Sequence, residues 1–144
     1  MIGTMKVLVG AAALAGGLAV ASVPAQAAAG PINYSCGPRI DTPRSGGQVD
    51  RVSGYNVRLF MKANAYSGQD IYFVKGYGLR PGDKVSLDWS DTKGRTYHAC
   101  HGTVHRGRTG AQTWAINDRG GYRSFRACVK TRGSWHCTYW GVGS

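Results

Sequence analysis

The stretch from residue 122 to residue 142 constrains the fold most, because its two cysteines match a cross-linked β-hairpin. If the chain turns at Arg132-Gly133, Cys128 falls directly opposite Cys137. Directly opposed residues of an antiparallel pair lie within the Cα separation that a disulfide bridges. Strand alternation then assigns the side chains to two faces. One face carries Phe125, Ala127, Val129, His136, Thr138 and Trp140, and the other carries Arg126, Cys128, Lys130, Trp135, Cys137 and Tyr139.

The N-terminus has the order of a secretory signal peptide. Lys6 precedes an apolar run over residues 7–23, which Pro24 and the small-residue site Ala25-Gln26-Ala27 follow. A membrane anchor is the alternative, but glycines interrupt the run and no positive flank follows it. We therefore expect residues 1–27 to be removed, the protein to be extracellular, and no segment to span a membrane. Cleavage after Ala27 leaves 117 of the 144 residues, enough for one domain.

All four cysteines follow the predicted leader. An even number in an exported chain indicates two disulfides, and four cysteines allow three pairings. The hairpin favours Cys128–Cys137, which leaves Cys36–Cys100 as the second bond.

Residues 28–54 and 55–144 differ in pattern. The first segment contains Pro31, Pro38, Pro43 and Gly46-Gly47 with little apolar periodicity, so it is predicted to be an extended arm tied down at Cys36. The second contains about seven short runs of strand type, with turn signals every eight to twelve residues. These runs are 55–67, for which a short helix remains an alternative, 69–75, 84–90, 95–101, 111–117 and the two strands of the C-terminal hairpin. The predicted fold is an all-β, immunoglobulin-like antiparallel β-sandwich.

One part of this pattern resembles a known family. Residues 68–89, GQDIYFVKGYGLRPGDKVSLDW, are similar to the strand–turn–strand of small exported immunoglobulin-like bacterial sandwiches such as the neocarzinostatin-type apoproteins. The resemblance implies the fold alone, because the cysteines are placed differently from that family's. The leader, size and arm are also similar to those of the small adaptor subunit of actinobacterial umbrella toxin particles, although no motif carries that likeness.

The charge is strongly positive and uneven. After residue 27 the chain has seventeen lysines and arginines against seven aspartates, and it has no glutamate. Residues 95–144 hold eight of the basic residues and a single acid, Asp118. Such a balance favours acidic partners, namely nucleic acid, anionic lipid, wall polymers or an acidic protein surface. A basic exported protein with a solvated surface is the alternative.

Histidines and one cysteine form the candidate catalytic or metal cluster. Zinc needs three or four converging ligands, but strand alternation directs His98 and Cys100 away from His101 and His105. We therefore expect no metal and no cofactor. A small basic secreted ribonuclease or antimicrobial effector acting on polyanions is the alternative function, and it would draw on His98, His105 and His136 with Arg106 and Arg108. No spacing fixes two of these histidines across one cleft, so no catalytic residue is assigned.

Arginines beside aromatic residues make the binding hypothesis. Five basic residues stand near Tyr122, Trp135 and Tyr139, and they are Arg119, Arg123, Arg126, Lys130 and Arg132. Charge plus stacking grips single-stranded nucleic acid, but the same arrangement is common as cation–π contact on an exposed sheet. Tyr, Trp and Arg also concentrate at protein interfaces, and the chain has eight, four and twelve of them. Alternatively, the aromatic residues fill a core that is poor in leucine.

The sequence therefore predicts a secreted, monomeric β-sandwich that binds rather than catalyses. The expected partner is another exported protein, with this chain as an adaptor, an inhibitor or a component of a toxin assembly. The predicted binding residues are Arg126, Lys130, Trp135 and Tyr139 on the hairpin, and Arg39 and Arg44 on the arm.

Overall fold

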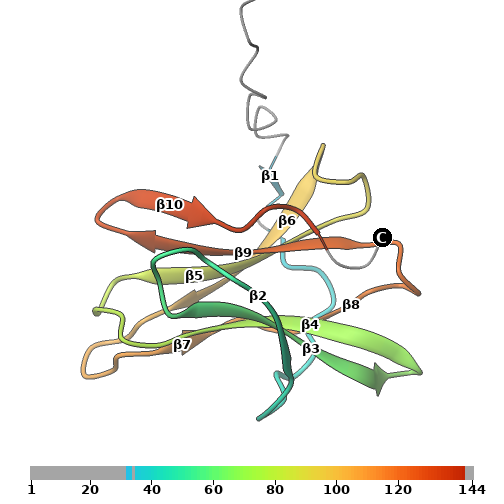
Figure 1. Ribbon diagram of the computed structural model, residues 1–144, viewed down its shortest axis with the longest axis horizontal. Helices are drawn as coiled ribbons and strands as arrows, with labels where there is room; N and C mark the ends of the chain where they lie inside the picture. The colour runs from blue at the N-terminus through green and yellow to red at the C-terminus, as the bar shows by residue number, and fades with distance from the viewer. Residues whose placement is uncertain (1–31, 34, 142–144) are drawn as a thin grey trace, which may run out of the picture.

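The computed structural model describes residues 32–33 and 35–141, and these residues form two β-sheets packed face to face (Figure 1). The predicted signal peptide lies outside the described residues. No helix is present in the described part of the chain, and thus none there has the length and apolarity to cross a membrane. The all-β class predicted from the sequence is confirmed.

The first sheet, here the ribbon sheet, contains the C-terminal hairpin. Its strand order is β1 (Ile32–Asn33), β6 (Tyr97–Thr103), β5 (Lys84–Ser90), β9 (Ser124–Thr131) and β10 (Ser134–Cys137). All neighbours are antiparallel except β1 and β6. The hairpin register is the predicted one, with Cys128 opposite Cys137. Both predicted disulfides, Cys36–Cys100 and Cys128–Cys137, are present.

The second sheet, here the strap sheet, has the order β2 (Gly47–Arg51), β3 (Val57–Tyr66), β4 (Gln69–Gly76) and β7 (Ala111–Gln112). Strand β8 (Ile116–Asn117) pairs farther along β4. The strand alternative for residues 55–67 is confirmed by β3. Strand β2 corrects the prediction that residues 28–54 contain no regular element, because Gly47–Arg51 pairs antiparallel with β3.

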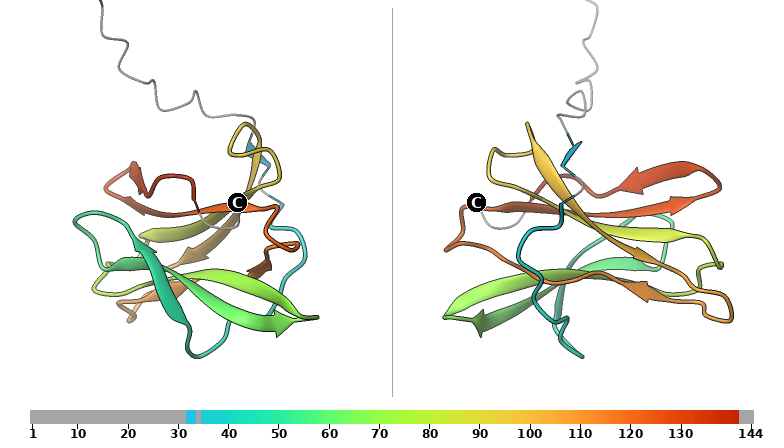
Figure 2. Two further views of the ribbon diagram at one scale, coloured as in Figure 1. Left: turned by 45° about the vertical axis from the view of Figure 1, so that its right-hand side comes forward. Right: turned by 180° about the vertical axis from the view of Figure 1, so that it is seen from behind.

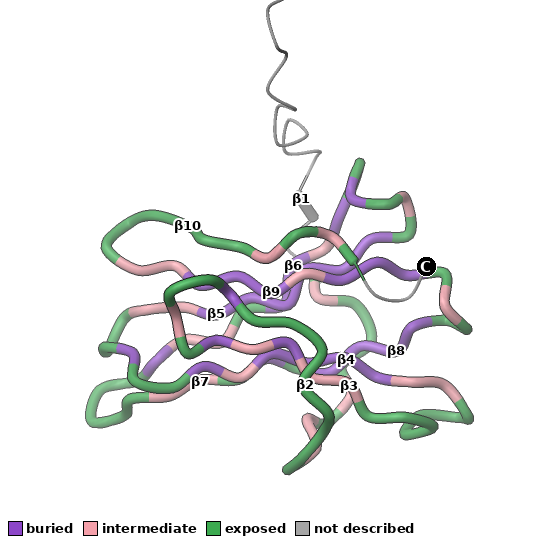
Figure 3. Tube along the Cα trace, viewed as in Figure 1, coloured by how far each residue is buried: buried purple, intermediate pink, exposed green. Residues whose placement is uncertain are grey.

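The core lies between the sheets, where the alternating apolar residues of both inner faces meet. Val85, Leu87 and Trp89 point inward as predicted. They pack against apolar side chains that include Val57, Leu59, Tyr72, Val74, Phe125 and Val129. Figure 3 shows the buried positions concentrated in these central strands, whereas β2 and β10 are exposed edges.

A segment without regular structure, residues 35–46, runs from the ribbon sheet to the strap sheet, and we call it the strap (Figure 2). Its start is held by the Cys36–Cys100 bond and by the Trp89 indole, which donates to the Cys36 carbonyl at 2.8 Å. Farther on, Ile40 forms an antiparallel bridge with Ala115. The strap thereby contributes to a second apolar cluster on the strap sheet, made of Ile40, Phe60, Ile71, Phe73 and Ala115.

Two local predictions are wrong. Residues 111–117 are not one strand, because β7 ends at Gln112, Ala115 pairs with the strap and β8 begins at Ile116, and Trp114 is 41% exposed. After β10 the chain also accommodates one extra residue, since Gly141 rather than Trp140 bridges Phe125. Trp140 consequently lies on the Arg126 face, and Tyr139 is 89% exposed.

Candidate functional site

The outer face of the ribbon sheet brings several basic and aromatic residues together. Strand pairing sets Lys84 beside Lys130 and Lys130 beside Trp135. The next row contains His101 and Ser86, followed by the Cys128–Cys137 disulfide. Directly paired residues project from the same face, so these side chains form one continuous surface.

Trp135 lies across this surface and contacts His101. The two rings are 5.4 Å apart between centroids, and the Lys130 ammonium is 5.9 Å from the Trp135 ring. Ser86 and Cys128, which belong to the strands between them, are buried. Burial lowers the pKa of His101, and the positive charges of Lys84 and Lys130 act in the same direction, while Asp88 opposes them. His101 therefore meets Trp135 as an uncharged ring at neutral pH.

A shallow hollow connects this surface to the strap. Its volume is about 270 Å³, and its lining includes Arg39, His101 and Trp114. The structure thus brings Arg39, a predicted binding residue, to the same side as Lys130 and Trp135. Trp114 and Trp135 are each 41% exposed. We call this surface the docking face, and it consists of Arg39, Lys84, His101, Trp114, Lys130 and Trp135.

Arg126 lies on the same outer face, one row beyond Ser86 and Cys128. Its Nε atom donates to the Asp88 carboxylate at 2.8 Å, and its guanidinium lies between the Tyr97 and Trp140 rings at 4.8 and 4.7 Å. The Ser86 hydroxyl donates to the other Asp88 oxygen. Asp88 is buried, so Arg126 is the counter-ion of an interior acid and only its margin meets solvent.

Two other arginines of the predicted polyanion site, Arg123 and Arg119, also pair with an acidic side chain of the fold. Arg123 is buried against the Trp89 ring at 4.1 Å and forms an ion pair with Asp91 at 3.2 Å. Arg119 approaches the same carboxylate at 3.7 Å. Of the five predicted cations, Lys130 and Arg132 are the two that form no ion pair within residues 35–141.

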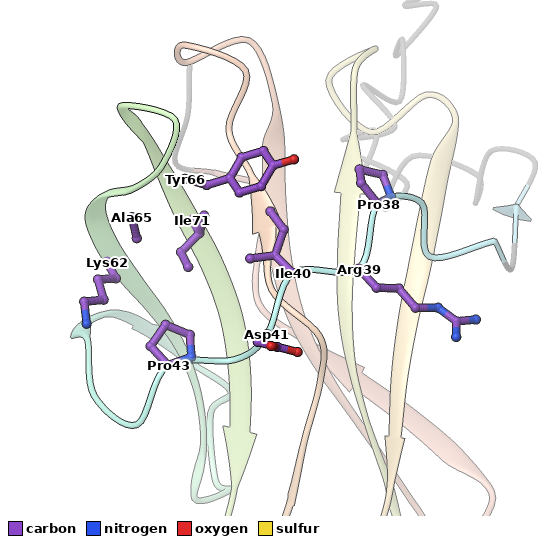
Figure 4. A pocket seen from close by; sticks show the side chains of 9 residues that line it. All are labelled: Pro38, Arg39, Ile40, Asp41, Pro43, Lys62, Ala65, Tyr66 and Ile71. Atoms are coloured by element: carbon purple, nitrogen blue, oxygen red, sulfur yellow. The ribbon is translucent and has the colours of Figure 1, made fainter.

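The remaining predicted residues lie apart from the docking face. Tyr139 projects into solvent beyond the end of β10. Arg44 belongs to the strap-sheet side, where its carbonyl accepts a hydrogen bond from the Lys75 ammonium at 2.8 Å. A groove of about 560 Å³ also lies there, between the strap and the β3–β4 hairpin, and Figure 4 shows the Arg39 side chain pointing away from its other lining residues.

The histidine cluster is dispersed by the fold. Cys100 is bonded to Cys36, which removes its sulfur from any ligand set. His98 on β6 stacks on Trp89 at 4.0 Å, and His136 on β10 contacts Tyr55 at 5.0 Å. Strands β5 and β9 lie between β6 and β10, so these two histidines do not face one cleft.

Asp88 also lies within 4.8 Å of the Cys128 and Cys137 sulfurs. Those sulfurs are bonded to each other and offer no thiolate to a metal ion.

Comparison with protein-family models, with curated proteins and with solved structures finds no match for this chain. The site therefore has to be judged from its own residues. Three of its members, Lys84, His101 and Trp114, were not among the predicted binding residues. Alternation did direct His101 away from His98 and Cys100, but its contact with Trp135 across two intervening strands had no signal in the sequence.

Proposed function

We propose that this protein is an exported binding module whose docking face engages another exported protein, as an adaptor, an inhibitor or a component of a toxin assembly. The observation that carries the proposal is the pair of half-exposed tryptophans, Trp114 and Trp135, that both lie near His101: Trp135 contacts its ring, and Trp114 lines the same hollow. Tryptophan and arginine dominate the binding energy of protein interfaces.

The support beneath these residues favours binding. Trp135 belongs to a hairpin that is closed by a disulfide, and His101 belongs to a central part of the same sheet. Side chains that are already held in place lose less conformational entropy when a partner binds. Lys84, Lys130 and Arg39 border the tryptophans, so the expected partner surface is acidic.

Export completes the proposal. The predicted leader directs the chain out of the cell, and the two disulfides are compatible with an oxidising compartment. With its partner absent the protein is proposed to be a monomer.

A quantitative pull-down with the tagged mature protein tests the docking face. The bait is incubated with exported proteins of the producing organism, and captured proteins are compared between the native chain and Trp135→Ala. We expect at least a tenfold loss of the specific partner, because a central aromatic contact is removed. The matched control is Tyr77→Ala, which truncates an aromatic residue of similar exposure in the β4–β5 turn.

Two outcomes would overturn the proposal. One is equal capture by the native chain and Trp135→Ala, and the other is equal loss in the Tyr77→Ala control. RNA digestion that disappears in His98→Ala or His136→Ala would instead establish the ribonuclease alternative.

A further inference from the structure

Three cations lie side by side on the outer face of the strap sheet, away from the docking face. Arg51 on β2 pairs directly with Arg58 on β3, and Arg58 pairs directly with Lys75 on β4. Val57, Leu59 and Val74 are buried on the inner face, so alternation turns Arg58 and Lys75 outward. Neighbouring strands are about 4.8 Å apart, so this cation row spans about 10 Å.

No acidic side chain neutralises the cation row. The three ion pairs formed among the described residues all lie elsewhere. The Lys75 ammonium donates to the Arg44 carbonyl, and the Arg51 Nε atom donates to the Tyr55 carbonyl, so both meet neutral partners. Asp50 precedes Arg51, but its carboxylate accepts a hydrogen bond from the Arg51 backbone amide.

Arg58, in the middle of the row, lacks a hydrogen-bond partner that its side chain needs, within the part of the chain that the structure describes. Its Nε atom is buried and has no hydrogen-bond partner among the described residues. A buried donor without a partner is costly, and like charges placed directly opposite each other in a sheet destabilise it. An anion lying on the row would offset the repulsion between the three cations.

We propose that the cation row, Arg51, Arg58 and Lys75, is a binding site for a phosphate group. A guanidinium presents a planar fork of donors that fits the oxygens of a phosphate, and hydrogen bonds between charged groups are the strong ones. Arg44 of the strap borders the site through its contact with Lys75, which gives this predicted binding residue a place on the strap sheet. The phosphate is either a free ion or part of a linear phosphate polymer.

Isothermal titration calorimetry on the mature protein tests the site. Sodium phosphate and long-chain polyphosphate are titrated separately at constant ionic strength into the native chain, Arg58→Gln and Arg51→Gln. We expect each variant to weaken phosphate binding at least tenfold. The matched control is Arg95→Gln, an exposed arginine in the β5–β6 turn whose loss changes the net charge equally, and we expect a change of less than twofold.

Thermal unfolding gives a second readout that a general charge effect would not produce. Without phosphate, Arg58→Gln is expected to raise the midpoint of unfolding, because it removes repulsion and the unpaired donor. Phosphate should raise the midpoint of the native protein and of Arg95→Gln but leave that of Arg58→Gln unchanged. Tighter binding of the polymer per phosphate would identify a chain as the ligand, and equal binding would identify the free ion.

The proposal is overturned if the native protein binds neither phosphate probe, or if Arg58→Gln and Arg95→Gln weaken binding equally. It is also overturned if polyphosphate binding survives in Arg58→Gln and Arg51→Gln. None of these results bears on the docking face, because Trp135 and the cation row belong to different sheets.

Discussion

On the outer face of each sheet, an arginine near the start of a strand has different neighbours. On the ribbon sheet, Arg126 has a buried aspartate beneath it and an aromatic ring on either side. On the strap sheet, Arg58 has a cation on each flanking strand and an unpaired Nε atom. The contrast shows that an arginine in a strand is structural when the fold supplies its acid. It is available to a ligand when the fold does not.

The two faces are also covered in different ways. Side chains of the ribbon sheet cover their own face, since Trp135 contacts His101 and Trp140 contacts Arg126. The strap sheet instead receives a separate piece of main chain, the strap, over Phe73 and Ile71. Its cover therefore depends on how the strap is anchored, and the Cys36–Cys100 bond is the anchor nearest its start.

The largest expected effect is the loss of stability when each disulfide is removed. Replacing Cys36 and Cys100 by serine should lower the free energy of unfolding by about 4 kcal/mol, because that bond closes a loop with a sequence separation of 64. Replacing Cys128 and Cys137, with a separation of 9, should cost about 2.5 kcal/mol. Denaturant unfolding of the two double variants gives both values.

The comparison would break if the short loop proved the more costly to open. A secondary readout is binding of an apolar dye, which should increase in the Cys36→Ser/Cys100→Ser variant alone as the strap leaves Phe73 exposed.

The next effect concerns the interior acid of the ribbon sheet. Asp88→Asn keeps the shape of the side chain but leaves Arg126 without its counter-ion, and we expect a loss of about 3 kcal/mol in the free energy of unfolding. Replacing both residues, as Asp88→Leu with Arg126→Met, should recover most of that loss. Denaturant unfolding of Asp88→Asn and of the double variant measures the loss and its recovery.

Arg119→Ala is the control, because it removes an arginine whose ion pair with Asp91 is exposed. Its cost should stay below about 1 kcal/mol. A similar loss in Arg119→Ala and Asp88→Asn would mean that burial of the pair adds nothing.

Local pattern predicted the parts of the molecule that depend on neighbours in sequence. The hairpin register follows from the spacing of Cys128 and Cys137, and the inward direction of Leu87 follows from alternation. Cys36–Cys100 was predicted only by elimination once the hairpin pair was assigned. Strand β2 could not be predicted, because its residues are all exposed and it exists through pairing with β3.

The sites show the same division. The sequence gathered arginines near aromatic residues, but it could not separate Arg126, whose acid comes from β5, from Lys130, which has none. The cation row was missed because Arg51, Arg58 and Lys75 come from three strands and meet only through register. The extra residue after β10, which puts Trp140 on the Arg126 face, likewise depends on a tertiary bridge to Phe125.

The smallest expected effect tests whether the stability of the folded chain depends on an uncharged His101. Burial lowers the pKa of His101 below the ordinary value of 6.5, so the unfolded chain binds this proton more readily than the folded chain. Stability should therefore be independent of His101 above pH 6.5 and should fall as the pH drops below it. His101→Gln should flatten that slope, measured by denaturant unfolding at pH values above about 5, where aspartates remain charged.

His105→Gln, a change in an exposed loop, serves as the control and should retain the slope. The charges around His101 sharpen the test, because Lys84 and Lys130 oppose its protonation and Asp88 favours it. Replacing Lys130 by glutamine should therefore raise the pKa of His101 and narrow the pH range over which stability is lost. A slope that persists in His101→Gln would show that a group other than His101 takes up the protons that destabilise the folded chain.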